Sequence, residues 1–117
     1  MIERSFRLTR STDFQRVRRI GKSFAHPLIV LIALPNQLEK SRFGVVAGKA
    51  IGKAVQRNRA KRLLRAAVRA HCDVLPPGWD VVLIARRSML QADFEQTQKA
   101  LEVLLHKAKL VQEFHDR

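Results

Sequence analysis

The feature that most constrains this chain is a basic segment, residues 53–69, which reads KAVQRNRAKRLLRAAVR. It holds seven Lys or Arg residues and no Asp or Glu. Drawn as a helix, it has one cationic face within an arc of roughly 140°. That face contains Arg57, Asn58, Lys61, Arg62, Arg65 and Arg69. The opposite face is small and apolar, with Ala60, Leu63, Leu64, Ala67 and Ala70. The segment therefore predicts a helix that packs one face on a core and turns the other outward.

The outward face needs a negatively charged partner. Like charges four residues apart destabilise an isolated helix by a few tenths of a kcal/mol per pair, and an ordinary solvated face mixes both signs. A phosphate backbone explains the pattern better, because each Arg can grip phosphate oxygens with its planar fork. Asn58 is either a base or sugar contact or a neutral spacer. Arg59, near the border of the apolar face, either touches a different part of the nucleic acid or covers the edge of the core.

The charge of the whole chain is equally one-sided. The net charge is +13. Residues 1–71 hold 17 Lys or Arg and 3 Asp or Glu, a net +14, whereas residues 72–117 hold 6 and 7, a net −1. Solubility or attraction to anionic lipid explains such an excess poorly. The distribution indicates one region that binds nucleic acid and a near-neutral scaffold.

Length predicts a single domain over residues 1–117, and the charge makes it a nucleic-acid-binding domain. No apolar run is long enough to span a bilayer, and the first residues lack a signal-peptide pattern, so we expect no membrane association and no export. The single cysteine, Cys72, excludes an internal disulfide and fits a cytoplasmic location.

The apolar periodicity and the turn residues predict an α+β chain. The first expected element is a helix over 11–20, with Thr12 as N-cap and Gly21 as its stop. A short strand at Lys22–Ala25, strands over 27–35 and 42–48, and a flexible basic loop over 48–52 follow. After the loop we expect the basic helix over 53–71, a strand over 80–85, and a last helix capped by Asp93 with Gln96. The last helix has an apolar stripe of Phe94, Leu101, Leu104, Leu105, Ala108 and Val111. The order αβββαβα predicts a two-layer α/β sandwich with helices packed on one sheet.

No residues form a catalytic constellation in the sequence. The acidic residues are dispersed, and most are expected as caps, turns or solvent-facing helix positions. His71 and Cys72 are better explained as a packed helix end than as a metal or nucleophile pair. A Gly-rich phosphate loop is absent. We therefore predict no catalytic residue and no metal ligand in this chain.

The segment GKAVQRNRAKRLLRAAVR, residues 52–69, closely resembles the signature of the bacterial ribonuclease P protein subunit. RLTRSTDFQRVRRIGKSF and DVVLIAR resemble other segments of that family. The resemblance implies a fold like the second domain of ribosomal protein S5, with a left-handed βαβ crossover through the basic helix. It also implies a ribonucleoprotein endonuclease that removes the 5′ leader of precursor tRNA. In that family the RNA subunit is catalytic, with bound Mg²⁺, and no organic cofactor or obligate protein partner is implied.

The resemblance assigns roles to particular residues. The RNA-binding helix positions are Arg57, Asn58, Arg59, Lys61, Arg62 and Arg65, to which the helix geometry adds Arg69. Positions that line the leader cleft are Phe14, Arg18, Val30 and Ile32, and Lys49 and Lys53 are supporting cations. The family often has an aromatic residue in place of Arg18 and a Tyr in place of Ile32. Where it commonly has Ser-Val-Ser-Lys-Lys, this chain has VAGKA, Val46–Ala50. The alternative function is a ribosomal-type protein that binds structured RNA without enzymatic activity.

Overall fold

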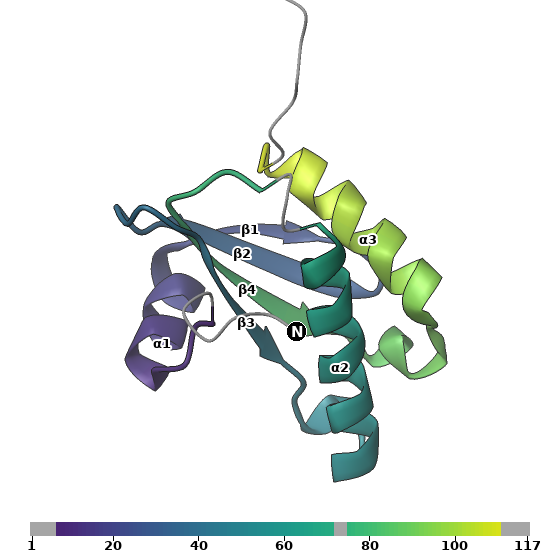
Figure 1. Ribbon diagram of the computed structural model, residues 1–117. Coiled ribbons are helices and arrows are strands. Elements are labelled where there is room, and N and C mark those ends of the chain that lie inside the picture. The colour runs from purple at the N-terminus through teal and green to yellow at the C-terminus, as the bar shows by residue number, and fades with distance from the viewer. Residues whose placement is uncertain (1–6, 72–74, 111–117) are drawn as a thin grey trace, which may run out of the picture.

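The computed structural model of the protein describes residues 7–71 and 75–110. Within them, a four-stranded sheet carries helices on both of its faces (Figure 1). The helices and strands in chain order are α1 (Ser11–Ile20), β1 (Lys22–Ala25), β2 (Ile29–Pro35), β3 (Arg42–Val46), α2 (Ala54–Ala70), β4 (Trp79–Ala85) and α3 (Phe94–Lys107). Two short 3-10 turns are η2 (Lys49–Ile51) and η4 (Arg87–Gln91). The predicted order αβββαβα, including the short strand β1, is confirmed.

The strand order in the sheet is β1-β2-β4-β3, which places β3 at an edge. β2 is antiparallel to both of its neighbours, and β3 runs parallel to β4. The chain passes from β3 through α2 to β4, with α2 in front of the sheet and β4 above β3 in Figure 1. This crossover is left-handed, whereas about 98% of parallel crossovers are right-handed. The left-handed crossover that the family resemblance implied is therefore present.

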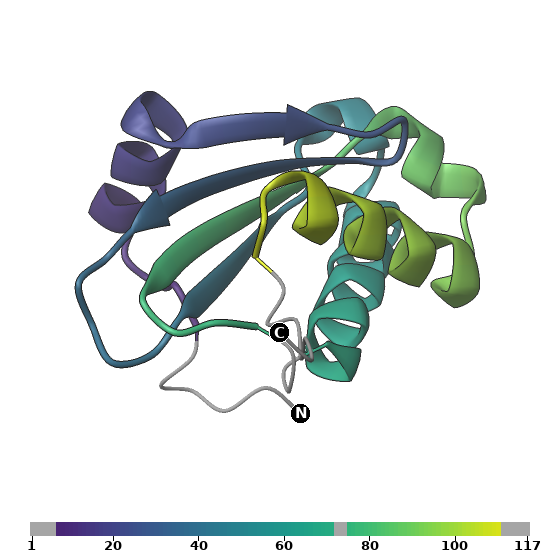
Figure 2. The ribbon, with the colours of Figure 1, turned by 90° about the horizontal axis from the view of Figure 1, so that it is seen from above.

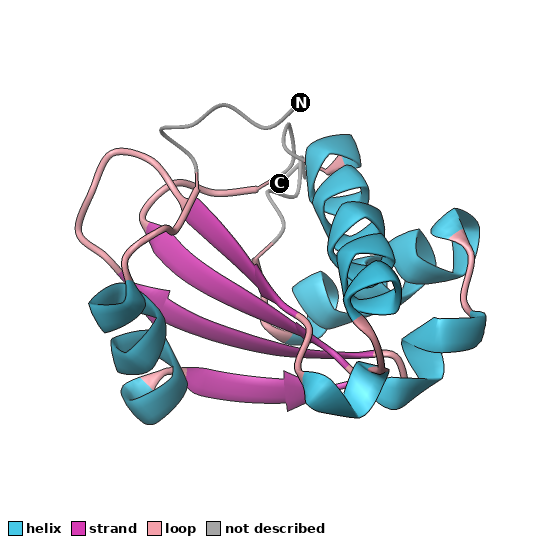
Figure 3. Cartoon of the chain, turned by 90° about the horizontal axis from the view of Figure 1, so that it is seen from below, coloured by secondary structure: helices cyan, strands magenta, loops and turns pink. Residues whose placement is uncertain are grey.

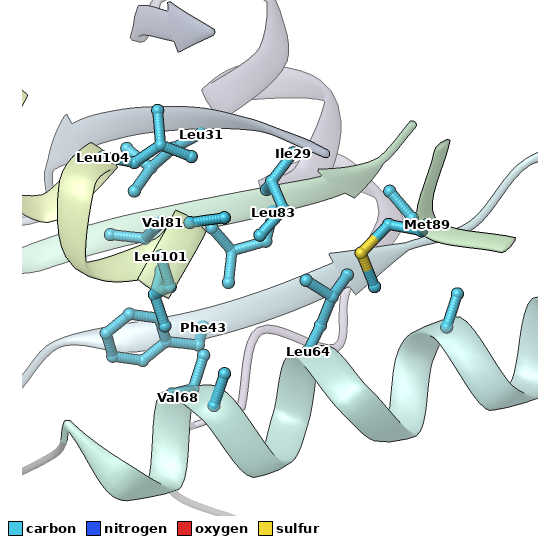
Figure 4. Close-up of a cluster of buried hydrophobic side chains, with 14 of the residues drawn as sticks. Ile29, Leu31, Phe43, Leu64, Val68, Val81, Leu83, Met89, Leu101 and Leu104 are labelled. Atoms are coloured by element: carbon cyan, nitrogen blue, oxygen red, sulfur yellow. The ribbon is translucent and has the colours of Figure 1, made fainter. Parts of the chain in front are cut away.

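The larger hydrophobic core lies between the sheet and the pair α2 and α3, which share one face (Figure 2). Figure 4 shows Leu64 and Val68 of α2 next to Phe43 and Leu83 of the sheet. Full burial of one such aliphatic side chain contributes about 1.5–3 kcal/mol relative to exposure. The core therefore fixes α2 against the sheet and leaves its basic face outside.

The opposite face of the sheet carries α1 at one end (Figure 3). Successive residues of a strand face opposite sides, so the register groups this face into three rows across β2, β4 and β3. The rows are Leu34–Asp80–Arg42, Ile32–Val82–Gly44 and Val30–Ile84–Val46. The middle row is buried, together with Val17 of α1, whereas the last row stays half-exposed. We call Val30, Ile84 and Val46 the open row.

Two glycines allow α1 to lie close to the sheet. A Cβ on Gly44 would overlap the ring of Phe14, and a Cβ on Gly21 would overlap the side chain of Ile32 and the carbonyl of Val17. A side chain at either position would therefore force α1 away from the sheet. Gly21 also ends the helix, as predicted, and its N–H donates to the carbonyl of Val17 at 2.8 Å.

The prediction that Thr12 caps α1 is wrong. The helix begins at Ser11, its N-cap is Arg10, and no side chain caps it. The cause is the segment before the helix: Leu8 is buried, and its N–H donates to the carbonyl of Phe43 at 2.8 Å. This tertiary anchor determines where the helix starts.

The loop expected over residues 48–52 is also different. Lys49–Ile51 forms the 3-10 turn η2, because Ile51 is 1% exposed and anchors the segment in the core. The expected strand over 42–48 correspondingly ends earlier, at Val46.

The predicted cap of α3 is confirmed, since Asp93 accepts from the backbone N–H of Gln96 at 2.8 Å and the Gln96 side chain accepts from that of Asp93 at 3.0 Å. Phe94, however, is 40% exposed rather than part of the buried stripe, because it is the first residue of the helix. Ala70, expected on the apolar face of α2, is exposed at the last turn of that helix. Val111 lies outside the described residues.

Candidate nucleic-acid interface

The outer face of α2 is a continuous cationic surface. Its buried residues are Ala60, Leu64, Ala67 and Val68. Asn58, Arg62, Arg65 and Arg69 are exposed, whereas Arg57 and Lys61 are half-buried. The ion pairs recorded within residues 7–71 and 75–110 include no Lys or Arg of this helix. In the same residues, the Arg57 Nε atom is buried and has no hydrogen-bond partner. The face therefore carries positive charge and donors that no side chain of the described part neutralises.

Arg59 differs from the other basic residues of α2. Its Nη2 donates to the carbonyl of Ala92 at 2.6 Å, and its Nη1 donates to that of Met89 at 3.4 Å. Both carbonyls lie in the segment from η4 to the start of α3. The guanidinium therefore ties α2 to that segment and covers the edge of the core, which was one of the two expected roles. An RNA contact by Arg59 stays a prediction.

Two further predicted cations extend the α2 surface at its N-terminal end. Lys49 lies in η2, and Lys53 is the N-cap of α2. Both side chains are exposed. The Lys53 backbone N–H donates to the Gln56 Oε1 atom at 2.8 Å, which satisfies one of the free donors at the helix start. The cationic surface thus begins before the first turn of the helix.

On the other face of the sheet, α1 borders the open row. At 100° per residue, Phe14 and Val17 point towards the sheet, and Arg18 lies on the opposite flank of the helix from Asp13 and Arg16. Since Arg16 reaches the row that contains Asp80, Arg18 lies on the flank nearer to the open row. Ile32 is 7% exposed beneath α1, so of the two predicted sheet positions Val30 offers more surface. The sequence reasoning missed Ile84 and Val46, which follow Asp80 and Arg42 at every second position and share their face.

A buried carboxylate joins α1 to the sheet at the opposite end. Asp80 has no exposed side-chain surface. Arg42 donates to it twice, from Nε to Oδ1 at 2.9 Å and from Nη2 to Oδ2 at 2.7 Å. Asn36 Nδ2 donates to Oδ1 at 2.9 Å, and Arg16 Nη2 donates to Oδ2 at 3.3 Å. Asp13 adds longer ion pairs to Arg16 and Arg42 at 3.8 and 3.7 Å. One carboxylate thus links α1, the end of β2 and the starts of β3 and β4.

The contacts of Asp80 keep it ionised. Burial alone would raise its pKa, but the hydrogen bonds from Arg42 and Asn36 and the charges of Arg42 and Arg16 outweigh burial, so the pKa of Asp80 lies below its ordinary value. The hydrogen bond to Asp80 in turn raises the pKa of Arg42. The network is therefore charged and paired at neutral pH. The only sign of this network in the sequence is one acidic residue, Asp80, at the start of an apolar strand.

A small hollow of about 170 Å³ lies where the two surfaces approach each other. Arg65 and Val68 of α2 line one part of it, and Phe14 of α1 and Gly44 of β3 line another. The edge strand β3 separates the two helices, which lie on opposite faces of the sheet. The fold thus brings Phe14 and Arg65, which belong to two predicted RNA-contacting sets, to the same hollow.

Comparison with known proteins decides the family. A family model described as Ribonuclease P matches residues 2–109. The chain is 44% identical over 116 residues to the ribonuclease P protein component of Herpetosiphon aurantiacus, covering 99% of this chain and 92% of that protein. The chain belongs to the ribonuclease P protein family. Among solved structures, a mutant of the RNase P protein of Staphylococcus aureus is similar, with a TM-score of 0.85, 31% identity and 92% of each chain covered.

The RNase P protein of Thermotoga maritima has the same fold, with a TM-score of 0.78, 32% identity, and 86% of this chain and 96% of that chain covered. Membership of the ribonuclease P protein family makes this chain a component of a tRNA-processing ribonucleoprotein, and an RNA partner follows from that. The predicted family and role as the protein subunit are therefore confirmed.

Across the described ranges, no helix is both long and apolar enough to cross a membrane. The same residues contain no group of three or more His, Cys, Asp or Glu side chains placed to hold a metal ion. The individual RNA contacts assigned to the site residues stay predictions.

Proposed function

We propose that this protein holds two RNA segments next to each other, the RNA subunit of ribonuclease P along α2 and the 5′ leader of precursor tRNA along α1 and the open row. The observation that carries the proposal is the hollow lined by both Phe14 and Arg65. It joins a cationic helix on one side of β3 to a partly apolar surface on the other. A protein with this arrangement can orient a leader relative to the RNA that cuts it.

The α2 surface suits a folded RNA. Exposed Arg62, Arg65 and Arg69 and half-buried Arg57 and Lys61 present guanidinium and ammonium donors along one face. Each phosphate neutralised releases condensed counterions, so affinity falls steeply with salt. Such contacts position an RNA without reading its sequence. Asn58, within this face, supplies both a donor and an acceptor.

The surface around α1 suits a single strand. The open row offers aliphatic side chains, Phe14 offers a ring, and Arg18 offers a charge. Base stacking on an aromatic side chain is worth about 1–3 kcal/mol per base. Because this chain contains no Tyr and has Arg18 and Ile32 where the family often has aromatic residues, its leader binding depends more on charge and less on stacking.

The chemical step in this proposal belongs to the RNA subunit. Mg²⁺, bound mainly by that RNA, supplies the stabilisation of charge at the phosphate that is cut. The protein binds and orients, and it has no proton-transfer role. We place the reaction in the cytoplasm. The protein itself needs no organic cofactor and no obligate protein partner.

Reconstitution tests the proposal. With its cognate RNA at low Mg²⁺, the protein is expected to accelerate 5′ cleavage of a leader-bearing precursor tRNA over the RNA alone, whereas the protein alone cleaves nothing. No gain at any Mg²⁺ concentration would contradict it. Recovery of RNA from a lysate separates the alternative, since enrichment of ribosomal RNA instead of ribonuclease P RNA would favour a ribosomal-type protein.

A further inference from the structure

Asp80 receives more partners than its charge requires. Arg42 binds both carboxylate oxygens, and Asn36 adds a third hydrogen bond. A bidentate Arg already neutralises a carboxylate and satisfies much of its hydrogen-bonding capacity. Arg16 nevertheless reaches Asp80 from α1 at 3.3 Å, while 45% of its own side chain stays exposed. The contact from Arg16 therefore serves to hold α1, the helix that carries Arg16, and is not needed to neutralise Asp80.

Within the described residues, α1 packs on a smaller core than α2 and α3 do. The core under α2 and α3 contains most of the buried residues. The cluster under α1 has four buried residues, with partly buried side chains packed against it: Leu8, Val17, Ile32 and Val82 are buried, and Phe14, Val30, Leu34, Val46 and Ile84 are partly buried. The contacts at Gly21 and Gly44 set how closely α1 approaches the sheet. Close contact at these glycines prevents α1 from moving towards the sheet, but it does not prevent α1 from moving away, because a glycine has no side chain that could bond to its neighbour.

Among the described residues, two ion pairs join α1 to the sheet, and the Arg16–Asp80 pair at 3.3 Å is shorter than the Asp13–Arg42 pair at 3.7 Å. The Arg16–Asp80 pair lies on the flank of α1 opposite to Arg18, at the end of the sheet away from the open row. Phe14, Arg16 and Arg18 belong to one helix of ten residues. A rotation or lift of α1 that moves Arg16 away from Asp80 would therefore also move Phe14 and Arg18. The pair therefore sets the position of the helix flank that borders the open row.

We propose that Arg16 and Asp80 are positioning residues for leader binding, which hold α1 so that Phe14 and Arg18 border the open row. The proposal rests on the proposed function of that surface. Arg16 acts through the helix, and it need not touch the leader.

Arg16→Met in the reconstituted holoenzyme tests this, with Arg19→Met as the matched control. Arg19 is exposed on the outer face of the same helix, so its loss removes the same charge without the Asp80 contact. Affinity is measured for precursor tRNA with a long leader and with a single-nucleotide leader. R16M is expected to weaken long-leader binding about fivefold or more, because a displaced ring loses part of its base stacking. Short-leader binding stays unchanged, and R19M alters the ratio of the two affinities by less than about twofold.

Two further readouts separate positioning from direct contact and from stability. Hydrogen exchange of the α1 amides is expected to accelerate in R16M and not in R19M, with β2 and β4 unchanged. The slope of log affinity against log salt is expected to stay the same, whereas a lost phosphate contact would reduce it by about 0.7–0.9. Arg16→Lys, whose ammonium keeps one contact with Asp80, is expected to restore most of the long-leader affinity.

Several outcomes overturn the proposal. Equal losses for both leader lengths, a reduced salt slope or an R16M protein that does not fold would each remove the positioning role. Retained leader preference in R16M would overturn this inference alone. A wild-type holoenzyme without any leader preference would overturn the proposed function of the surface and the inference with it.

Discussion

Asp80 has no exposed side-chain surface, so the free energy of its charge depends on its neighbours. Taking an ion out of water costs several kcal/mol, which is recovered only with good geometry and satisfied hydrogen bonds. Arg42 and Asn36 meet both conditions at 2.7–2.9 Å. The lowered pKa of Asp80 is the measurable result, because the fold stabilises its ionised form more than water does.

Stability should therefore fall in acid in a way that depends on Asp80. A lowered folded pKa contributes stability that is present above the unfolded pKa of about 3.9 and is lost as the pH falls through the folded value. We expect Asp80→Asn to lower the free energy of unfolding at neutral pH by about 2–4 kcal/mol and to flatten its decline below about pH 4. Urea unfolding at a series of pH values measures both effects.

Asp93→Asn is the control for this substitution. It removes one carboxylate from an exposed N-cap, where Asn caps as well as Asp. Its stability should stay close to that of the wild type, and its decline in acid should remain. If D80N and D93N show the same dependence on pH, the network does not account for acid unfolding.

Arg59 allows a second test at the residue scale. Arg59→Met leaves the carbonyls of Ala92 and Met89 without their charged donor. Hydrogen bonds to a charged group contribute about 1.5–3 kcal/mol, so we expect a loss of that order in the free energy of unfolding. Arg62→Met, at an exposed position of the same helix, should change it by less than about 0.5 kcal/mol. If R59M and R62M lowered the free energy of unfolding in urea equally, the hydrogen bonds from Arg59 to the Ala92 and Met89 carbonyls would add nothing to stability.

At the scale of elements, α2 combines a docking face and a binding face in one helix. Its buried Ala and Leu residues let it approach the sheet, and the family crossover leaves its basic residues beside the edge strand β3. The salt dependence of RNA binding reports how many of those charges meet phosphate. Because α2 has no acidic residue of its own, none of its charges is paired within the helix, and only Arg59 is tied to backbone carbonyls within the described residues.

Arg57→Ala and Arg65→Ala should each flatten the salt dependence of RNA affinity by about one unit of log–log slope or less. The reason is the loss of one phosphate contact and of the counterion release that goes with it. Filter binding or fluorescence titration over a range of salt concentrations measures the slope. Lys99→Ala, on the exposed side of α3 and paired with Glu95, is the control and should leave the slope unchanged. Unchanged slopes in both Arg variants would argue against phosphate contacts at these positions.

The sequence predicted those elements whose signals are local. The period of 3.6 residues located α2 and α3 to within a few residues, and the Asp93 cap is encoded by two residues three positions apart. Thr12 carried the same kind of signal and is not a cap, because contacts between Leu8 and Phe43 decide where α1 begins. The open row and the Asp80 network depend on strand register, which no local pattern specifies.

At the scale of the whole molecule, the two candidate RNA surfaces lie on opposite faces of the sheet and share the edge strand β3. Val46 of the open row lies at its end, and Gly44 and Val45 line the hollow beside Arg65. Residues 1–71 supply every residue of the two candidate RNA surfaces apart from Ile84, and they carry a net charge of +14. The near-neutral remainder of the chain supplies β4, in the middle of the sheet, and η4 and α3, which pack in the core beside α2.

This concentration of charge should make the protein more stable when salt is added. Three like-charge pairs four residues apart on α2, Arg57–Lys61, Lys61–Arg65 and Arg65–Arg69, each cost about 0.2–0.5 kcal/mol, or about 1 kcal/mol together. Raising sodium chloride from about 0.02 to about 0.2 M shortens the screening length from about 20 to about 7 Å, which weakens these pairs more than the buried contacts of Asp80. Because the charges lie about 5–6 Å apart, this screening removes roughly half of the repulsion, and we expect the thermal midpoint to rise by about 2–3 °C. Arg65→Gln removes two of the three pairs, so its midpoint should start higher and respond about one third as much. A midpoint that falls with salt in the wild type would show that ion-pair attraction, and not repulsion along α2, dominates the electrostatics of the fold.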